Sequence, residues 1–82
     1  MTTPIMTVAQ ARARAEIVRL RNLAAWQRDD YAASHYRQSE RPIYAGQVEI
    51  CIGKAQQAER IAASTDAQAD IIQAPIDAGE II

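Results

Sequence analysis

The chain lacks most of the features that stabilise a small protein or mark an active site. It has a single cysteine, Cys51, and no phenylalanine, and proline and glycine occur only three times each. One cysteine cannot form an intramolecular disulfide, and no Cys or His spacing is typical of a zinc site. No apolar run approaches the ~20 residues that a membrane-spanning helix needs. These absences argue against a disulfide-stapled domain, a zinc-stabilised domain and a membrane span.

Charge is nearly balanced over the whole chain but is divided unequally along it. The formal net charge of the 82 residues is −1, so no strong overall field attracts nucleic acid or a membrane surface. Residues 1–41 contain seven arginines and four acids, whereas residues 42–82 contain two bases and six acids. This division favours two halves that fold against each other or associate head to tail. A chain of this length forms one domain at most.

The apolar content of 49% overstates the core that the chain can build. Seventeen of the residues counted are alanines, which let helices approach closely but each remove little apolar surface from water. A small helical scaffold with so few large side chains needs additional burial. We therefore expect the chain to complete its core by oligomerisation or by docking on a larger protein.

Local signals predict an all-α fold, an antiparallel hairpin of two helices. Thr7 and Gln10 can form a capping box before a long stretch without glycine or proline. Pro42 suits the first turn of a second helix, and Pro75 should end that helix. The expected segments are an irregular lead-in over 1–7, a first helix over about 8–38, a turn over 39–42, a second helix over about 43–74 and an extended arm over 75–82.

Two points in the second helix leave alternatives open. Val48, Ile50 and Ile52 occupy alternate positions, as they would in a strand, and a lone strand would need a partner strand from another subunit. The polar cluster at 64–66 could end the helix near 64–65 and begin a short third one. The apolar periodicity runs unbroken through both points, which favours one continuous helix.

Each helix carries a row of small or apolar residues spaced alternately by four and three, which is a heptad pattern. In the first helix the row is Ala11, Ala15, Val18, Asn22, Ala25, Asp29, Ala32 and Tyr36. In the second helix it is Tyr44, Val48, Cys51, Ala55, Ala58, Ala62, Thr65, Ala69 and Ile72. If the chain reverses near residue 40, the rows face each other, with Ala25 opposite Ala55 and Ala11 opposite Ala69.

The same register predicts the contacts along one edge of the hairpin. Two ion pairs and one apolar pair are expected there: Arg12 beside Asp66, Arg19 beside Glu59, and Trp26 beside Ile52. Exposed ion pairs contribute ~0–1 kcal/mol each, so they specify the register more than they stabilise the fold.

The first helix has a second apolar row, which the second helix does not cover in this register. A helix with two apolar rows usually buries both, so we predict that this row binds a partner. The predicted contact residues are Ile17, Leu20, Leu23, Ala24 and Tyr31, with Arg14, Arg21 and Arg28 as a charged rim.

Candidates for catalysis or metal binding are few. His35 is the only histidine. The neighbouring carboxylates Asp29, Asp30 and Glu40 complete no known metal or acid–base motif with it. Cys51 falls on the small-residue row, where a cysteine packs as a compact apolar side chain. We therefore expect no enzymatic activity, no cofactor and no metal.

These patterns together predict a non-enzymatic protein–protein interaction module, either a small assembly subunit or an inhibitor or adaptor that covers a partner's surface. Chains of this size with so little core occur among virion components and phage-encoded accessory proteins. The alternative is a small nucleic-acid-binding helical protein whose arginine row on the first helix contacts phosphates. Residues 1–7 show neither the basic start nor the apolar run of a secretion signal. The expected location is the cytoplasm or a soluble assembly such as a virion.

Overall fold

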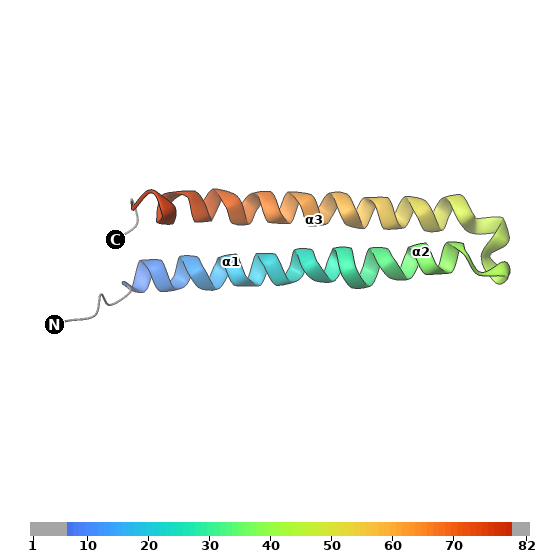
Figure 1. The fold of residues 1–82 in the computed structure, drawn as a ribbon, viewed down its shortest axis with the longest axis horizontal. Coiled ribbons are helices and arrows are strands. Elements are labelled where there is room, and N and C mark those ends of the chain that lie inside the picture. Colours follow the sequence, from blue (N-terminus) through green and yellow to red (C-terminus); the bar gives the residue numbers. More distant parts are fainter. Residues whose placement is uncertain (1–6, 80–82) are drawn as a thin grey trace.

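The computed structural model describes residues 7–79, which form one antiparallel helical hairpin (Figure 1). The first arm comprises α1 (Val8–Trp26), the π-helical turn η1 (Gln27–Ala32) and α2 (Ala33–Ser39). The 3-10 segment η2 (Pro42–Gln47) connects this arm to α3 (Val48–Asp77), which forms the second arm. The predicted all-α two-helix hairpin is confirmed, and no residue in the described range lies in a strand.

The first arm begins where the capping signal predicts. The backbone N–H of Gln10 donates to the Thr7 hydroxyl at 3.1 Å, and the backbone N–H of Thr7 donates to the Gln10 side chain at 3.3 Å. Each bond satisfies an N–H group that the helix itself leaves without a partner. From Val8 to Ser39 the backbone then stays helical without interruption.

The connection between the arms is longer than predicted. Arg41 is extended (φ −83°, ψ 136°), as the residue before a proline prefers to be. Pro42 begins a 3-10 segment instead of α3, because Tyr44 (φ −103°, ψ 15°) and Gln47 (φ −126°, ψ 16°) leave helical geometry. Regular α-helix therefore starts at Val48 and not near residue 43.

This longer connection shifts the register of the two arms. Ala55 lies in one buried cluster with Ala58 and Ala32, whereas the sequence predicts Ala25 opposite Ala55. The predicted register is therefore wrong. Its assumption of a reversal near residue 40 fails because the chain reverses within Pro42–Gln47, and every facing pair moves accordingly.

The row of α1 that contacts α3 also differs from the predicted one. Ile17 and Leu20 are 8% and 5% exposed and pack with Ala69, and Ala24 is buried as well. Val18, from the predicted row, is 57% exposed. Three residues that we assigned to a partner, Ile17, Leu20 and Ala24, thus belong to the core of the hairpin itself. This row contacts α3 because its larger side chains remove more apolar surface from water than the alanine row would.

The π-helical turn explains why the predicted row faces away from α3 in α1 but faces α3 after the turn. An α-helix returns to nearly the same face after seven residues, so with Ala24 facing α3 the next such residue would be Tyr31. A π turn has i→i+5 hydrogen bonds and accommodates one extra residue. Ala32 therefore faces α3 instead and is almost completely buried.

The row predicted for the second arm is confirmed over most of its length. Its buried members are Cys51, Ala55, Ala58, Ala62, Thr65 and Ala69. Segment 48–52 is helical, and α3 continues without a break through 64–66. The Thr65 hydroxyl donates to the carbonyl of Ile61 at 2.8 Å, so this polar group is satisfied inside the helix.

The prediction that Pro75 ends the second helix is wrong. Pro75 lies inside the last turn of α3, which extends to Asp77. Gly79 ends the helix with φ 74°, in the left-handed conformation typical of glycine after a helix, and its N–H donates to the Ile76 carbonyl at 3.1 Å. Residues 75–77 are therefore not an extended arm. The predictions for residues 1–6 and 80–82 lie outside the described residues.

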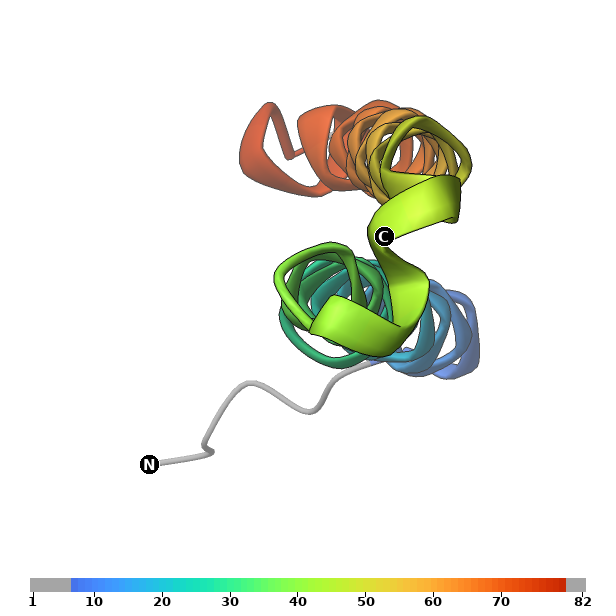
Figure 2. The same cartoon turned by 90° about the vertical axis from the view of Figure 1, so that its right-hand side faces the viewer.

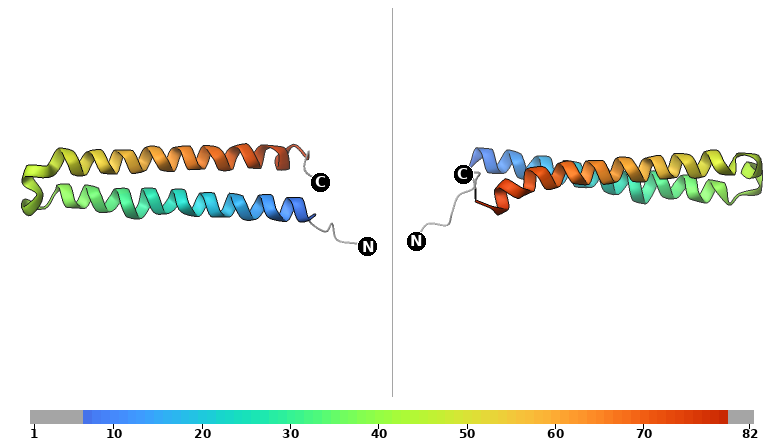
Figure 3. Two further views of the ribbon diagram at one scale, coloured as in Figure 1. Left: turned by 180° about the vertical axis from the view of Figure 1, so that it is seen from behind. Right: turned by 90° about the horizontal axis from the view of Figure 1, so that it is seen from above.

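The two arms form a narrow rod. Seen end on, the described chain consists of two helical columns side by side (Figure 2), and seen from above they cross at a shallow angle (Figure 3). A shallow crossing is typical of coiled-coil packing. No large side chain among the described residues is completely buried. The core is therefore one thin layer, and its two long edges face outward.

Candidate functional site

The two edges of the hairpin differ in composition. In α3, Ile61 and Asp66 are five residues apart, which separates them by about 140° around the helix. They therefore border opposite edges. We call one the charged edge, comprising Arg21, Arg28, Asp66 and Asp70, and the other the aromatic edge, comprising Leu23, Trp26, Tyr31 and Ile61.

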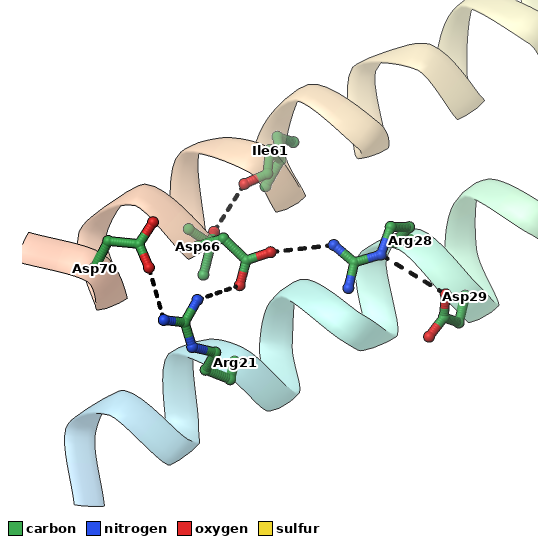
Figure 4. A network of polar contacts seen from close by, with 7 residues as sticks. Arg21, Arg28, Asp29, Ile61, Asp66 and Asp70 are labelled. Atoms are coloured by element: carbon green, nitrogen blue, oxygen red, sulfur yellow. Dashed lines mark hydrogen bonds and ion pairs between the residues drawn. The ribbon is translucent and has the colours of Figure 1, made fainter. Parts of the chain in front are cut away.

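Along the charged edge, one carboxylate of α3 accepts hydrogen bonds from two arginines of the first arm (Figure 4). Arg21 Nη1 donates to Asp66 Oδ1 at 3.1 Å, and Arg28 Nη1 donates to Asp66 Oδ2 at 3.1 Å. Arg21 Nη2 also donates to Asp70 Oδ1 at 2.7 Å. The two arginines are seven residues apart and point to the same side. Asp66 therefore joins two turns of the first arm to one position of α3.

The electrostatics of this network follow from its hydrogen bonds. Those from Arg28 and Arg21 lower the pKa of the Asp66 carboxyl below its ordinary value. The bonds to Asp70 and Asp66 raise the pKa of the Arg21 guanidinium. All these side chains remain partly open to water, so solvent screens the attraction between them.

The ion pairs predicted for the edge are wrong, because they depended on the register. Arg19 pairs within its own helix, with Nε 3.0 Å from Glu16 Oε2. Glu59 instead accepts a hydrogen bond from the Tyr36 hydroxyl, which raises the pKa of that phenol. Asp66, predicted beside Arg12, pairs with the two arginines of the charged edge.

Along the aromatic edge, large side chains surround an open groove of about 300 Å³. Trp26, Tyr31 and Ile61 are 47%, 41% and 44% exposed. Trp26 therefore lies beside Ile61 and not beside Ile52 as predicted. The remaining residues that line the groove are Gln27, Lys54, Gln57 and Ala58. Leu23 lies on the same side of α1, one helical turn before Trp26, and is also exposed.

The π turn brings the aromatic rings together. Trp26 and Tyr31 are five residues apart, a spacing that an α-helix would separate by about 140°. The i→i+5 geometry of the π turn instead aligns them, and their ring centroids are 5.6 Å apart. The His35 ring meets Tyr31 edge-on at 4.6 Å. The π turn therefore has two effects. It changes which row of the first arm is buried, and it brings the exposed rings of Trp26 and Tyr31 into contact.

The two residues considered for catalysis lie on different arms, His35 in α2 and Cys51 in α3. His35 contacts Tyr31, and its Nδ1 lies 3.1 Å from the Gln38 side-chain oxygen. Cys51 is buried in the small-residue row of α3. Within residues 7–79, no group of three or more His, Cys, Asp or Glu side chains is arranged to hold a metal ion.

The structure divides the predicted partner-binding residues into three groups. Ile17, Leu20 and Ala24 are buried between the arms and have little or no exposed surface for a partner to contact. Leu23 and Tyr31 lie on the aromatic edge. On the opposite side, Arg14 is exposed, and Arg21 and Arg28 belong to the charged edge. Contact of any of them with a partner stays a prediction.

Three residues that line the groove were not predicted from the sequence as part of a site: Ile61, Lys54 and Gln57. A signal for Ile61 was present, because Ile50, Ile61 and Ile72 recur every eleven residues, which is about three helical turns. Such a row lies on one face of the helix, beside the alanine row.

No helix within residues 7–79 is both long and apolar enough to cross a membrane. We compared the chain with models of protein families, with curated proteins and with solved structures, and no match was found in any of the three.

Proposed function

We propose that this protein is a non-enzymatic protein–protein interaction module, and that it binds its partner through the aromatic edge. One observation carries the proposal: Trp26, Tyr31 and Ile61, each exposed by more than two fifths, surround an open groove on one side of the hairpin. Leu23 extends this apolar surface along α1. Scattered apolar residues are normal on a protein surface, but a contiguous cluster that includes Trp and Tyr is typical of an interface.

The surroundings of the groove support this proposal. Lys54, Gln27 and Gln57 form part of its lining, and an apolar centre with a polar rim is the usual anatomy of a protein interface. Trp26 and Tyr31 restrain each other through their ring contact. Ordering them on binding therefore costs less conformational entropy than ordering two independent side chains.

The thin core gives a second physical reason. Within residues 7–79 the only large buried side chains are those of Ile17 and Leu20, and the other buried apolar positions are alanines and a cysteine. Small helical domains with so little buried apolar area are marginal on their own. A partner on the aromatic edge stabilises the folded hairpin by mass action, because it binds the folded and not the unfolded chain. Such a protein would serve as a small assembly subunit, or as an inhibitor or adaptor that covers a partner.

The charged edge gives less support to the nucleic-acid alternative. Arg21 and Arg28 already donate to Asp66 and Asp70. Phosphate oxygens would have to displace these carboxylates, which would also repel the phosphates. Arg14 is exposed on the same side, but one arginine makes only a weak phosphate site.

Site-specific photo-crosslinking in the organism that encodes the chain tests the proposed function. A photoreactive amino acid replaces Ile61 in one variant and Arg60 in a matched control, since Arg60 is exposed on the neighbouring face of α3. We expect irradiation to give a discrete protein adduct from position 61 and none from position 60. Equal labelling at both positions, or no protein adduct at position 61, would contradict the proposal.

A further inference from the structure

We infer that the hairpin opens in two steps, and that the half next to the connection opens while the other half stays folded. We call the first the tip half, comprising η1, α2, η2 and residues 48–60 of α3. The second is the terminal half, comprising α1 and residues 61–77 of α3. The inference goes beyond the proposed function, because it concerns the stability of the chain by itself.

The terminal half contains the large side chains of the core. Ile17 and Leu20 are 8% and 5% exposed and form a buried cluster with Ala69. Ile72 and Ile76 are partly buried and pack against this cluster. Because the free energy of burial grows with the apolar area removed from water, these side chains make the terminal half the more stable one.

The core of the tip half consists of small side chains. Ala32, Ala55 and Ala58 form a second buried cluster, separate from the first. Cys51 is buried as well, and no large side chain between residues 27 and 60 is. Each alanine removes little apolar area from water, so the tip half loses less free energy of burial when its arms separate.

The backbone of the tip half is weaker too. Its first arm begins with the π turn at Gln27–Ala32, a geometry that helices seldom adopt. Its second arm has Gly53 at an exposed helical position, where glycine favours the unfolded chain more than alanine does. A Cβ atom at Gly53 would meet no other atom within 4 Å, so packing does not require glycine there.

Polar contacts between the arms do not offset this difference. The Tyr36 hydroxyl of α2 donates to Glu59, and Arg28 of η1 donates to Asp66. Both contacts are exposed, and such contacts contribute little to stability. Segments with few buried apolar contacts open at a lower free energy than the rest of a protein. Because η2 joins the two arms, the opened segments stay close and can reclose without unfolding the terminal half.

This opening would control the groove of the aromatic edge. Tyr31 of the first arm and Lys54 of α3 line the groove, as does Ala58 of the second cluster, so the groove needs both arms of the tip half in contact. A partner in the groove therefore binds only the closed form. It makes opening rarer by a factor that grows with its free concentration. This consequence rests on the proposed function, whereas the opening itself does not.

Native-state hydrogen exchange of the purified full chain, read residue by residue by NMR, tests the inference. After correction for intrinsic rates, the amides of residues 33–38 and 50–58 should exchange at least about tenfold faster than those of residues 17–24 and 63–70. Exchange of the faster group should also depend less on urea, because separation of the tip half exposes less surface than complete unfolding.

Two substitutions at exposed positions of α3 form a matched pair. Gly53→Ala should slow exchange in the tip half about fivefold, since alanine favours the helix over glycine by roughly that factor. Ala67→Gly makes the reverse change in the terminal half. It should speed exchange there about fivefold and leave the tip half within about twofold of its original rates. Helical ellipticity shows that both variants stay folded.

Equal rates in the two halves would overturn the inference, as would equal acceleration of both halves by Ala67→Gly, because a single cooperative unit gives these results. So would a Gly53→Ala variant whose tip half exchanges at the original rates. The measurement needs no partner. If the halves differ as expected but position 61 gives no protein adduct, the separate opening stands and the proposed function fails. An adduct at position 61 together with equal exchange in both halves gives the reverse result.

Discussion

The charged edge and the aromatic edge belong to the same pair of helices. They differ in how far contacts within the chain pair or cover their side chains. Along the charged edge, Asp66 accepts hydrogen bonds from Arg21 and Arg28, and Asp70 accepts one from Arg21. Along the aromatic edge, Trp26 and Tyr31 contact each other and border a groove that no described element of the chain fills.

Alignment of the helices and burial of apolar surface are two roles that one packed core usually combines. In this hairpin they are divided between the two edges. Ion pairs open to water contribute little free energy, but they depend on the register of the two arms. Apolar side chains contribute more free energy when they are covered, yet they tolerate many partners and orientations. The contacts of the charged edge therefore favour the observed alignment of the two arms, and the aromatic edge holds apolar surface that no described part of the chain covers.

Leu20→Ala should have the largest effect, because it damages the core that both edges share. Removing a buried leucine side chain costs about 2–5 kcal/mol, which approaches the whole stability of a small domain. We expect urea denaturation followed by helical ellipticity to show partial or complete unfolding at low denaturant. Val18→Ala is the control. It should change the free energy of unfolding by less than about 0.5 kcal/mol, and a larger cost at Val18 than at Leu20 would make the alanine row the true contact of α1.

Trp26→Ala should separate folding from association. Trp26 is 47% exposed, so its loss should cost the isolated hairpin less than half of what Leu20→Ala costs. Its loss should abolish the association that the aromatic edge supports. The measurements are urea denaturation and photo-crosslinking from position 61. Ile71→Ala, at an apolar position that is 72% exposed, should affect neither. A cost at Trp26 as large as that at Leu20 would make the aromatic edge part of the core.

The residue patterns of the second arm predicted its contacts well. The alanine row of α3 has no competitor of larger side chains on its face, and it is buried from Cys51 to Ala69. The first arm has two rows, and periodicity alone could not choose between them. The row with Ile17 and Leu20 packs against α3 because it buries more apolar area. No glycine or proline marks the π turn at Gln27–Ala32, so the change of row there was invisible in the sequence.

The candidate site could be predicted only in part. Leu23 and Tyr31 were assigned to a contact surface from their spacing, and both are exposed on the aromatic edge. Trp26 was given the wrong neighbour, because contacts across the hairpin depend on where the chain reverses. That position depends on the backbone of Tyr44 and Gln47, and their departure from helical geometry has no strong sequence signal. A connection a few residues longer was enough to replace each predicted pair along the edges.

Asp66→Asn should have a smaller effect than either apolar substitution. Asparagine has nearly the same shape as aspartate but lacks the charge that attracts Arg21 and Arg28. We expect a modest decrease in the midpoint of thermal unfolding, larger than that for Asp70→Asn, because Asp70 receives only one of the arginine hydrogen bonds. In ~1 M salt, where the Debye length is about 3 Å, the difference between the variant and the original chain should shrink. A difference that is independent of salt would show that packing and not charge is responsible.

The smallest expected effect is a dependence of stability on pH, with opposite causes at its two ends. The pKa of Asp66 is lowered in the folded chain from an ordinary value of 3.8, so its stabilising contribution is complete above that value and is lost as the pH falls through the folded pKa. The pKa of Tyr36 is raised from 10.0, so its contribution is complete below pH 10 and is lost as the pH rises. Asp66→Asn should therefore flatten only the acid side of a plot of unfolding midpoint against pH, and Tyr36→Phe only the alkaline side. If either variant flattened both sides, the pH dependence would come from the net charge of the chain and not from these contacts between the two arms.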